Sequence, residues 1–293
     1  MGRTHATRRP VARAAAAAAL VVAGMLTGCG RGSDAAAVSD LVVTAGVDGG
    51  YEYDVPERVP AGLTRVSLVN DGEEPHHAQL LRLDDGATVD DLEAALAAGG
   101  PPAALSVGTF EGGTGLVDPG ETSRADAVVD LGEGTWVLIC FVEGPDGAPH
   151  VAHGMLRAFD VDGDGGGSGT PGSTDPPAAD AEVALVDYGV DAPDSLPGDA
   201  LLDVSNTSAA EPHELLVSRL EGDATAGDVI DAIEAGDRPP ARAVGGLQAI
   251  LPGASQRLQL DLEPGRYVLL CAVPSPDGVA HHAKGMVREV EVT

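Results

Sequence analysis

Short runs of alternating apolar and polar residues, separated by glycine and proline turns, occupy most of the chain from Ser39 onward. In residues 64–70, Val66 and Leu68 stand two positions apart and would share one face of a strand. A period of two is typical of a strand with one buried face. The same reasoning predicts further strands at residues 40–44, 51–55, 78–83, 125–131, 135–142 and 154–161. The pattern predicts an all-β fold.

One stretch in each half of the chain has helical spacing instead. Residues 88–98 carry an apolar stripe with the period of a helix. Thr88 can cap this helix, and Asp91 stands at the reciprocal position of a capping box. Residues 225–235 repeat the arrangement. We therefore expect one short helix inserted in each half.

The second half of the chain repeats the first. The stretch from Asn70 through Glu-Pro-His76 recurs from Asn206 to His213, and the Gly-x-aromatic-Val-Leu-x-Cys segment that ends at Cys140 recurs at Cys271. Self-similarity over such a length indicates a tandem duplication.

The duplication and a change of composition predict the domain boundaries. Residues 162–180 are rich in glycine, serine, proline and aspartate, as flexible linkers are. Each half has many short strands and Gly/Pro turns, the pattern of a Greek-key sandwich. We predict one domain at residues 38–161, a disordered linker at 162–180 and a second domain at 181–293.

The first 28 residues have the order of a secretory signal, with four arginines, then an apolar run, then small residues before Cys29. The tetrapeptide 26–29, Leu-Thr-Gly-Cys, resembles the bacterial lipobox. That resemblance implies a lipoprotein signal peptide at 1–28, lipid attachment at Cys29, a tether at 29–37 and a place on the extracytoplasmic face of the cell membrane.

The chain of 293 residues is strongly acidic, with a formal net charge of −29. Without the four arginines of the leader, 13 basic and 46 acidic residues remain. Such a field repels nucleic acid, so no nucleic-acid partner is expected. A basic protein partner and a merely solvated acidic surface both fit this charge.

Cysteine, histidine and methionine are scarce and occur together twice. The chain has three Cys, four Met and eight His. Nine residues separate Cys140 from His150, and four more separate that histidine from Met155; Cys271, His281 and Met286 repeat the spacing. Thiolate, imidazole and thioether form the soft donor set that suits copper. Buried Cys and Met are also ordinary core residues, which leaves a packing role open.

Taken with the Asn…Pro-His motif, these residues resemble the cupredoxins, and the plastocyanin branch most closely. The resemblance covers about 40–160 and 181–293. It implies two tandem Greek-key cupredoxin-like sandwiches, each with one copper bound by two His, one Cys and one Met. Carried over to this sequence, the implied ligands are His76, Cys140, His150 and Met155 in the first half, and His213, Cys271, His281 and Met286 in the second half.

The nine-residue loop between Cys and His is longer than in plastocyanin and azurin-type members. Two outcomes are open. If the loop doubles back, the four ligand atoms can meet; if it does not, the residues serve packing alone. His76 and His77 point to opposite faces of a strand, so we expect His77 on the surface. His153 is replaced by Lys284 in the second half and His282 by Val151 in the first half, so we expect neither histidine to be a ligand.

The function that these features predict is a lipid-anchored extracytoplasmic copper-binding protein, which transfers electrons through type 1-like sites. The alternatives are a metal-free cupredoxin-like binding or structural module, and copper storage or delivery. We expect a redox carrier and no enzyme, because the sequence has no evident catalytic set. The expected partners are the membrane, through the lipid anchor, and an unidentified redox or copper-handling protein.

Overall fold

The structure is a computed structural model that describes residues 37–163 and 176–293. The predicted signal peptide at 1–28, the lipid-attachment residue Cys29, most of the tether and the central part of the predicted linker lie outside these ranges. Among the described residues, no helix is both long and apolar enough to cross a membrane.

The first half contains nine strands and two α-helices. The strands are β1 (Ser39–Ala45), β2 (Tyr53–Asp54), β3 (Arg58–Pro60), β4 (Gly62–Asn70), β5 (His76–Leu83), β6 (Gly108–Val117), β7 (Ala125–Leu131), β8 (Gly134–Ile139) and β9 (Leu156–Asp162). The helices are α1 (Val89–Gly99) and α2 (Pro101–Ala104), with 3₁₀ turns η1 (Val47–Gly49) and η2 (His150–His153).

The second half contains nine strands in the same order and one α-helix. The strands are β10 (Ala181–Val186), β11 (Gly189–Asp191), β12 (Ser195–Leu196), β13 (Leu201–Asn206), β14 (His213–Leu220), β15 (Ala241–Ile250), β16 (Ser255–Leu260), β17 (Gly265–Leu270) and β18 (Val287–Val292). The helices are α3 (Ala226–Ala235) and the 3₁₀ turn η3 (His281–Lys284).

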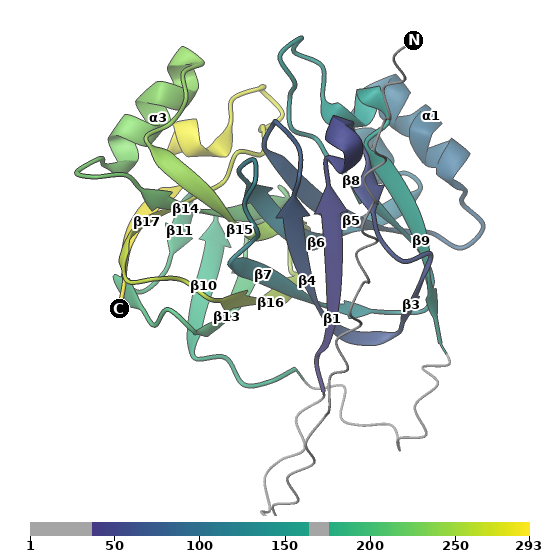
Figure 1. The fold of residues 1–293 in the computed structure, drawn as a ribbon, viewed down its shortest axis with the longest axis horizontal. Coiled ribbons are helices and arrows are strands. Elements are labelled where there is room, and N and C mark those ends of the chain that lie inside the picture. Colours follow the sequence, from purple (N-terminus) through teal and green to yellow (C-terminus); the bar gives the residue numbers. More distant parts are fainter. Residues whose placement is uncertain (1–36, 164–175) are drawn as a thin grey trace, which may run out of the picture. The chain divides into compact units, whose positions relative to one another are not determined.

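Each half is a sandwich of two sheets (Figure 1). In the first half the sheet orders are β2-β1-β4-β7 and β6-β5-β8-β9-β3. The second half has the equivalent orders, β11-β10-β13-β16 and β15-β14-β17-β18-β12. The predicted all-β, cupredoxin-like fold is confirmed, and the repeat extends to every strand.

The predicted helices are also present. Helix α1 begins after Thr88 and α3 after Thr225, and both N-termini carry the full capping box, with Asp91 and Asp228 as the reciprocal partners. Leu92 of α1 is fully buried against its sheet. The first half adds α2, which the sequence pattern did not predict.

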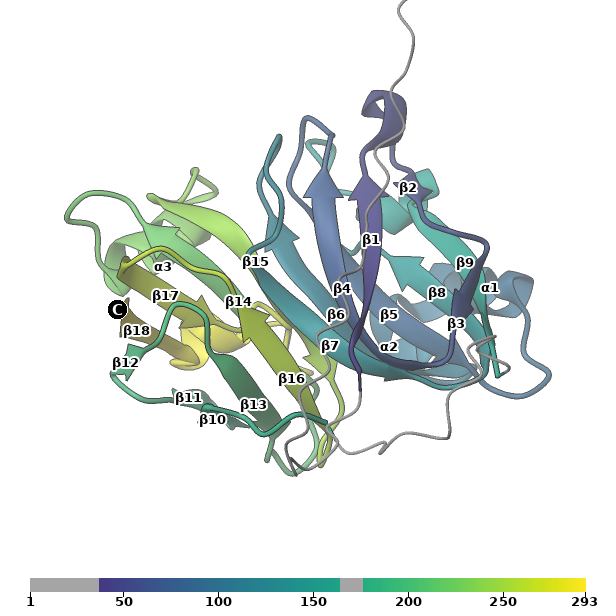
Figure 2. The same ribbon diagram turned by 60° about the horizontal axis from the view of Figure 1, so that its bottom comes forward.

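The two halves are joined through both sheets. Strand β7 pairs antiparallel with β16, and β6 pairs antiparallel with β15 (Figure 2). The strands approach closely at Gly245, since a Cβ atom placed on it would lie 2.4 Å from the carbonyl oxygen of Ala125. Side chains of both halves consequently form one continuous apolar cluster.

Candidate metal centres

An asparagine organises the segment that carries the first histidine of each half. The side-chain amide of Asn70 donates to the carbonyls of Glu74 and Val117, both at 2.8 Å, and its oxygen accepts from the Gly72 amide. These bonds hold the chain between β4 and β5, so His76 enters β5 in a fixed position. Asn206 makes the equivalent bonds before His213.

The cysteine follows directly after a buried strand. Trp136, Leu138 and Cys140 share the inner face of β8 and its extension, and all three are at most 1% exposed. Tyr267, Leu269 and Cys271 lie likewise on the inner face at the end of β17 and are at most 2% exposed. Both cysteines are free thiols. The alternation of strand side chains, as predicted, brings each thiol inside the sandwich.

The nine-residue loop after each cysteine doubles back as a small hairpin. The Gly147 amide donates to the Gly144 carbonyl at 2.9 Å, and the His150 amide donates to the Val142 carbonyl at 2.8 Å. Gly147 has φ +78°, a conformation that favours glycine at the tip of the turn. The second loop folds alike, with His281 bonded to Val273. The extra residues therefore form a turn, and the histidine that follows lies next to the cysteine.

Three of the four predicted ligands in each half meet in one buried cluster. In the first, His76 Nδ1 lies 3.0 Å from His150 Nδ1, and Cys140 Sγ lies 3.4 Å from His150 Nδ1 and 3.9 Å from His76 Nδ1. In the second cluster, the matching distances among His213, His281 and Cys271 are 2.9, 3.3 and 4.0 Å. The histidines are at most 2% exposed.

The methionines lie beside these clusters. Met155 and Met286 are fully buried. The Met155 amide donates to the His150 carbonyl at 3.1 Å, and the Met155 carbonyl accepts from the Cys140 amide at 3.2 Å. Met286 bonds to His281 and Cys271 in the same way. The backbone of each methionine is thus tied to two members of its cluster.

A glutamate on the outer side of each cluster is a feature that the sequence analysis missed. His150 Nε2 lies 2.9 Å from Glu74 Oε2, and His281 Nε2 lies 2.8 Å from Glu211 Oε2. The sequence did contain a pattern that could have indicated this glutamate, because Glu precedes Pro-His in both copies. A carboxylate on the outer nitrogen fixes the ring so that its other nitrogen faces inward.

A tyrosine covers the same edge of each cluster. The Tyr51 hydroxyl donates to Glu74 at 3.2 Å, and its ring centroid lies 4.7 Å from that of His150. Tyr188 donates to Glu211 at 2.8 Å and lies 5.0 Å from His281. The outer histidine is therefore screened from solvent by an aromatic ring.

The two sites differ at the residue after the first histidine. The expectation that His77 lies on the surface is wrong, because it is 7% exposed and its Nε2 accepts from the Phe141 amide at 3.0 Å. Glu214 takes its place in the second half and accepts from the Ala272 amide. His282 is also buried, and its Nδ1 lies 3.3 Å from the Cys271 carbonyl.

Burial dominates the pKa values of these groups. It raises the pKa of the Cys140 thiol to about 11 and that of the Cys271 thiol still further. Burial, together with the smaller effect of nearby His150, lowers the pKa of His76 to about 4. Each cysteine is therefore a protonated thiol in the metal-free protein, and metal binding would release the thiol proton.

The donors fit a metal ion. Donors about 2.0–2.3 Å from one shared tetrahedral metal lie roughly 3–4 Å apart, as they do in both clusters. In the second cluster, both outer Nε2 atoms face carboxylates, which only accept hydrogen bonds. If both rings are neutral, their inner Nδ1 atoms must then present lone pairs 2.9 Å apart. Such an arrangement requires a proton or a metal ion between them.

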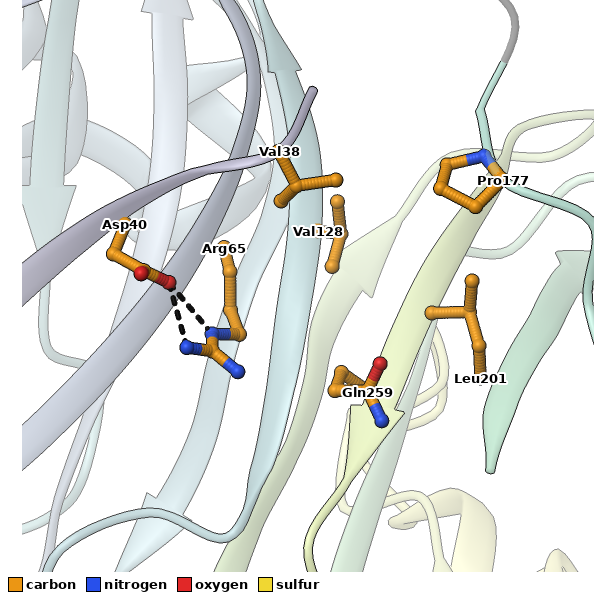
Figure 3. A pocket seen from close by; sticks show the side chains of 7 residues that line it. All are labelled: Val38, Asp40, Arg65, Val128, Pro177, Leu201 and Gln259. Carbon is orange, nitrogen blue, oxygen red and sulfur yellow. Dashed lines mark hydrogen bonds and ion pairs between the residues drawn. The ribbon is translucent and has the colours of Figure 1, made fainter. Parts of the chain in front are cut away.

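One hollow on the described surface lies away from these clusters. It is lined by Val38, Asp40, Arg65, Val128, Pro177, Leu201 and Gln259 (Figure 3). It contains none of the predicted site residues, and its charged pair, Arg65 and Asp40, is joined by an ion pair of 2.7 Å. The predicted metal ligands instead lie in the two buried clusters.

Comparisons with known proteins gave structural matches alone. No family model and no curated protein matches the sequence. Among solved structures, a reduced auracyanin from Roseiflexus castenholzii is similar at 27% identity, over 38% of this chain and 94% of that chain, with a TM-score of 0.28. A multicopper oxidase matches at 16% identity over 87% and 88% of the two chains, with a TM-score of 0.23. Copper nitrite reductase from Nitrosomonas europaea matches at 16% over 88% and 94%, with a TM-score of 0.23.

These matches correct one expectation. The sequence analysis predicted a carrier and no enzyme, but the matched structures include a multicopper oxidase and a copper nitrite reductase, which are enzymes. The prediction is therefore contradicted. The two-sheet sandwiches and the buried His-Cys-His clusters define a protein of cupredoxin-like fold, with one candidate metal site in each half.

Proposed function

We propose that this chain is a lipid-anchored protein of the extracytoplasmic membrane face that transfers electrons through two type 1-like copper sites. The observation that carries the proposal is the pair of buried His-Cys-His clusters, each built from a strand end and a returning loop. Two imidazoles, one thiolate and a weak axial thioether are the donors of a blue-copper centre.

Four side chains in each half would hold the metal. His76 and His150 offer inward Nδ1 atoms, Cys140 offers its sulfur, and Met155 stands beside them as the axial candidate. His213, His281, Cys271 and Met286 have the same roles in the second half. When bound, copper supplies a one-electron couple. The buried, cross-bonded side chains restrict rearrangement between its two oxidation states.

Copper loading of the purified protein, with each cysteine removed in turn, tests this function. Cu(II) added under non-oxidising conditions should give an intense visible thiolate-to-copper band and bind at up to two ions per chain. Cys140→Ser and Cys271→Ser should each remove one site and keep the other, and the double variant serves as the control. Without any such band or any rise in melting temperature, electron transfer is lost as a function and a metal-free module becomes the better account. Binding without reversible reduction would favour copper storage or delivery.

The lipid anchor rests on the sequence of residues 26–29 and the apolar run before it. Two or more acyl chains give stable attachment, whereas one chain is marginal. Cys29→Ala should release the protein from the membrane or block its maturation, while Ser33→Ala in the tether should change nothing. An unmodified Cys29 at the N-terminus of a secreted protein would rule out the anchor.

The two-domain division, with modules at 38–161 and 181–293, is part of the same proposal. The linker composition and the strand-by-strand repeat support it. Each module carries a complete set of candidate ligands, so each should bind its own copper.

A further inference from the structure

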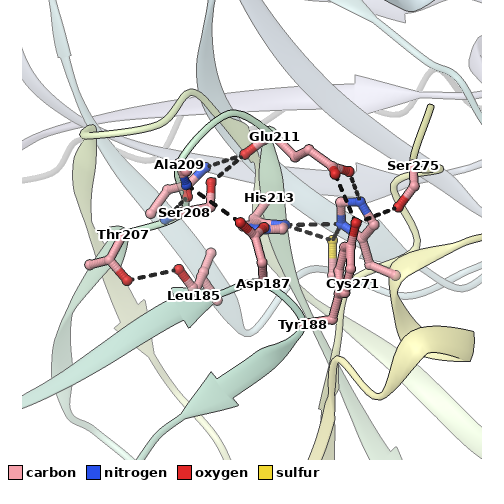
Figure 4. Close-up of polar contacts among 12 residues, drawn as sticks. Leu185, Asp187, Tyr188, Thr207, Ser208, Ala209, Glu211, His213, Cys271 and Ser275 are labelled. Carbon is pink, nitrogen blue, oxygen red and sulfur yellow. Dashed lines mark hydrogen bonds and ion pairs between the residues drawn. The ribbon is translucent and has the colours of Figure 1, made fainter.

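One contact distinguishes the two sites at the first histidine. In the second half, His213 Nε2 lies 2.9 Å from Asp187 Oδ1 (Figure 4). In the first half, among the residues that the structure describes, His76 Nε2 has no hydrogen-bond partner and faces Gly72 instead. A Cβ atom on Gly72 would lie 2.6 Å from this nitrogen.

Local packing explains why the first site has no carboxylate there. Gly46 follows β1 and packs on Gly72, and a Cβ atom on Gly46 would lie 2.3 Å from the Gly72 Cα. The two glycines therefore fill the space beside His76 with backbone. In the second half, Asp187 follows β10 directly, and its other oxygen accepts from the Ala209 amide at 3.4 Å. That bond helps hold the carboxylate against His213.

The charge at the two clusters is consequently unequal. His281 and His213 each face a carboxylate, Glu211 and Asp187, whereas only one histidine of the first cluster does. The aspartate side chain is 35% exposed, so solvent screens part of its charge but not all of it. The two ligand loops also differ, because Lys284 pairs with Asp277 in the second loop whereas a histidine, His153, pairs with Asp146 in the first.

We infer that Asp187 is a tuning residue that sets the reduction potential of the second copper site below that of the first. This inference rests on the proposed function, since it requires copper in both sites. A carboxylate on the outer nitrogen raises the basicity of the ligand and adds negative charge near the metal. Both effects stabilise Cu(II) more than Cu(I), because the oxidised ion carries the larger positive charge.

The consequence is an ordered pair of sites on one chain. When the protein is reduced, the site in the first half accepts an electron before the second site does, because its single glutamate opposes reduction less. The second site is the stronger reductant and is oxidised first. Asp187 contributes to this order without touching the metal, through its contact with His213.

Redox titration of the single-site variants tests the inference. Cys271→Ser leaves the first site and Cys140→Ser leaves the second, so each visible band reports one potential. At any one applied potential, we expect the ratio of Cu(II) to Cu(I) to be at least tenfold higher at the second site than at the first. For a one-electron couple, this corresponds to a reduction potential about 59 mV lower. Asp187→Asn in the Cys140→Ser background should remove most of that difference. Asp277→Asn, which removes a charge near the same site without touching a histidine, should shift the potential much less.

The outcomes separate this inference from the proposed function. If neither variant shows a copper band, the proposed function fails and the inference with it. If both bind copper but the potentials coincide, or the second is higher, the inference alone is overturned. Equal shifts from Asp187→Asn and Asp277→Asn would also overturn it, because the effect would then be general charge and not the contact to His213.

Discussion

Glu211 Oε2 lies 2.8 Å from His281 Nε2, and this contact is repeated between Glu74 and His150 at 2.9 Å. In each half the glutamate precedes the Pro-His that begins the ligand strand. One short segment thus supplies both a candidate ligand and the group that orients the other histidine. This coupling makes the Glu-Pro-His sequence part of the site.

Removing this carboxylate charge should weaken copper binding. Glu211→Gln retains a hydrogen-bond acceptor for His281 but lacks the charge that raises the basicity of the ring. Loss of such an outer partner typically lowers metal affinity by about 10–100-fold. Competition titration with a copper chelator, in the Cys140→Ser background, measures the change. Glu93→Gln on the exposed face of α1 is the charge-matched control, and an equal loss there would contradict the role of Glu211.

The axial methionine makes a different prediction. Met155→Leu should keep copper and raise the potential of the first site, because the thioether donates weakly to the oxidised ion. Leucine has nearly the volume of methionine, so the cost in stability should be below about 1.5 kcal/mol. The second site, in the same sample, provides an unchanged reference. An unaltered potential at the first site would show that the sulfur is no ligand.

Much of this architecture was predictable because each feature depends on local sequence. The period of two in the strands, the capping boxes at Thr88 and Thr225, and the burial of Cys140 follow from side-chain alternation and short-range bonds. The repeat then predicted which residues are equivalent in the two halves. The predicted copper ligands remain a prediction, although the geometry brings the His and Cys members together.

The remaining features depend on contacts between distant segments. Asp187 meets His213 only because β10 ends beside the start of β14, and no spacing in the sequence signals that contact. His77 was expected outside because alternation gives a strand two faces, but in this sandwich the outer face of β5 is buried as well. The pairing of β6 with β15 likewise joins residues more than 100 positions apart.

The buried groups His77 and Glu214 should give the two halves opposite pH responses. Burial lowers the pKa of His77 to about 3 from 6.5, so the unfolded chain binds the proton first and stability falls as the pH drops below 6.5. Burial raises the pKa of Glu214 to about 7 from 4.5, so stability falls as the pH rises from 4.5 to 7. Each slope is at most about 1.4 kcal/mol per pH unit.

Urea unfolding of the metal-free protein between pH 5 and 6.5 measures these slopes. Relative to the unaltered chain, His77→Gln should gain stability as the pH falls, and Glu214→Gln should gain stability as the pH rises. Both glutamines keep an acceptor for the backbone amide that each residue binds. Parallel pH profiles for the two variants would show that neither group titrates as its burial implies.

The junction of the two halves provides the last prediction. A Cβ atom on Gly115 of β6 would lie 2.5 Å from the carbonyl oxygen of Gly245 and 2.9 Å from the amide nitrogen of Gly246, both backbone atoms of β15. Gly115→Ala should therefore force the paired strands apart and destabilise the whole chain by about 1–3 kcal/mol, the usual cost of overpacking. Gly227→Ala in α3, where the added carbon meets only a 3.5 Å contact, should instead stabilise by about 0.5–1 kcal/mol. Thermal unfolding distinguishes the two, and a Gly115→Ala chain as stable as the unaltered protein would show that the β6–β15 pairing contributes nothing to stability.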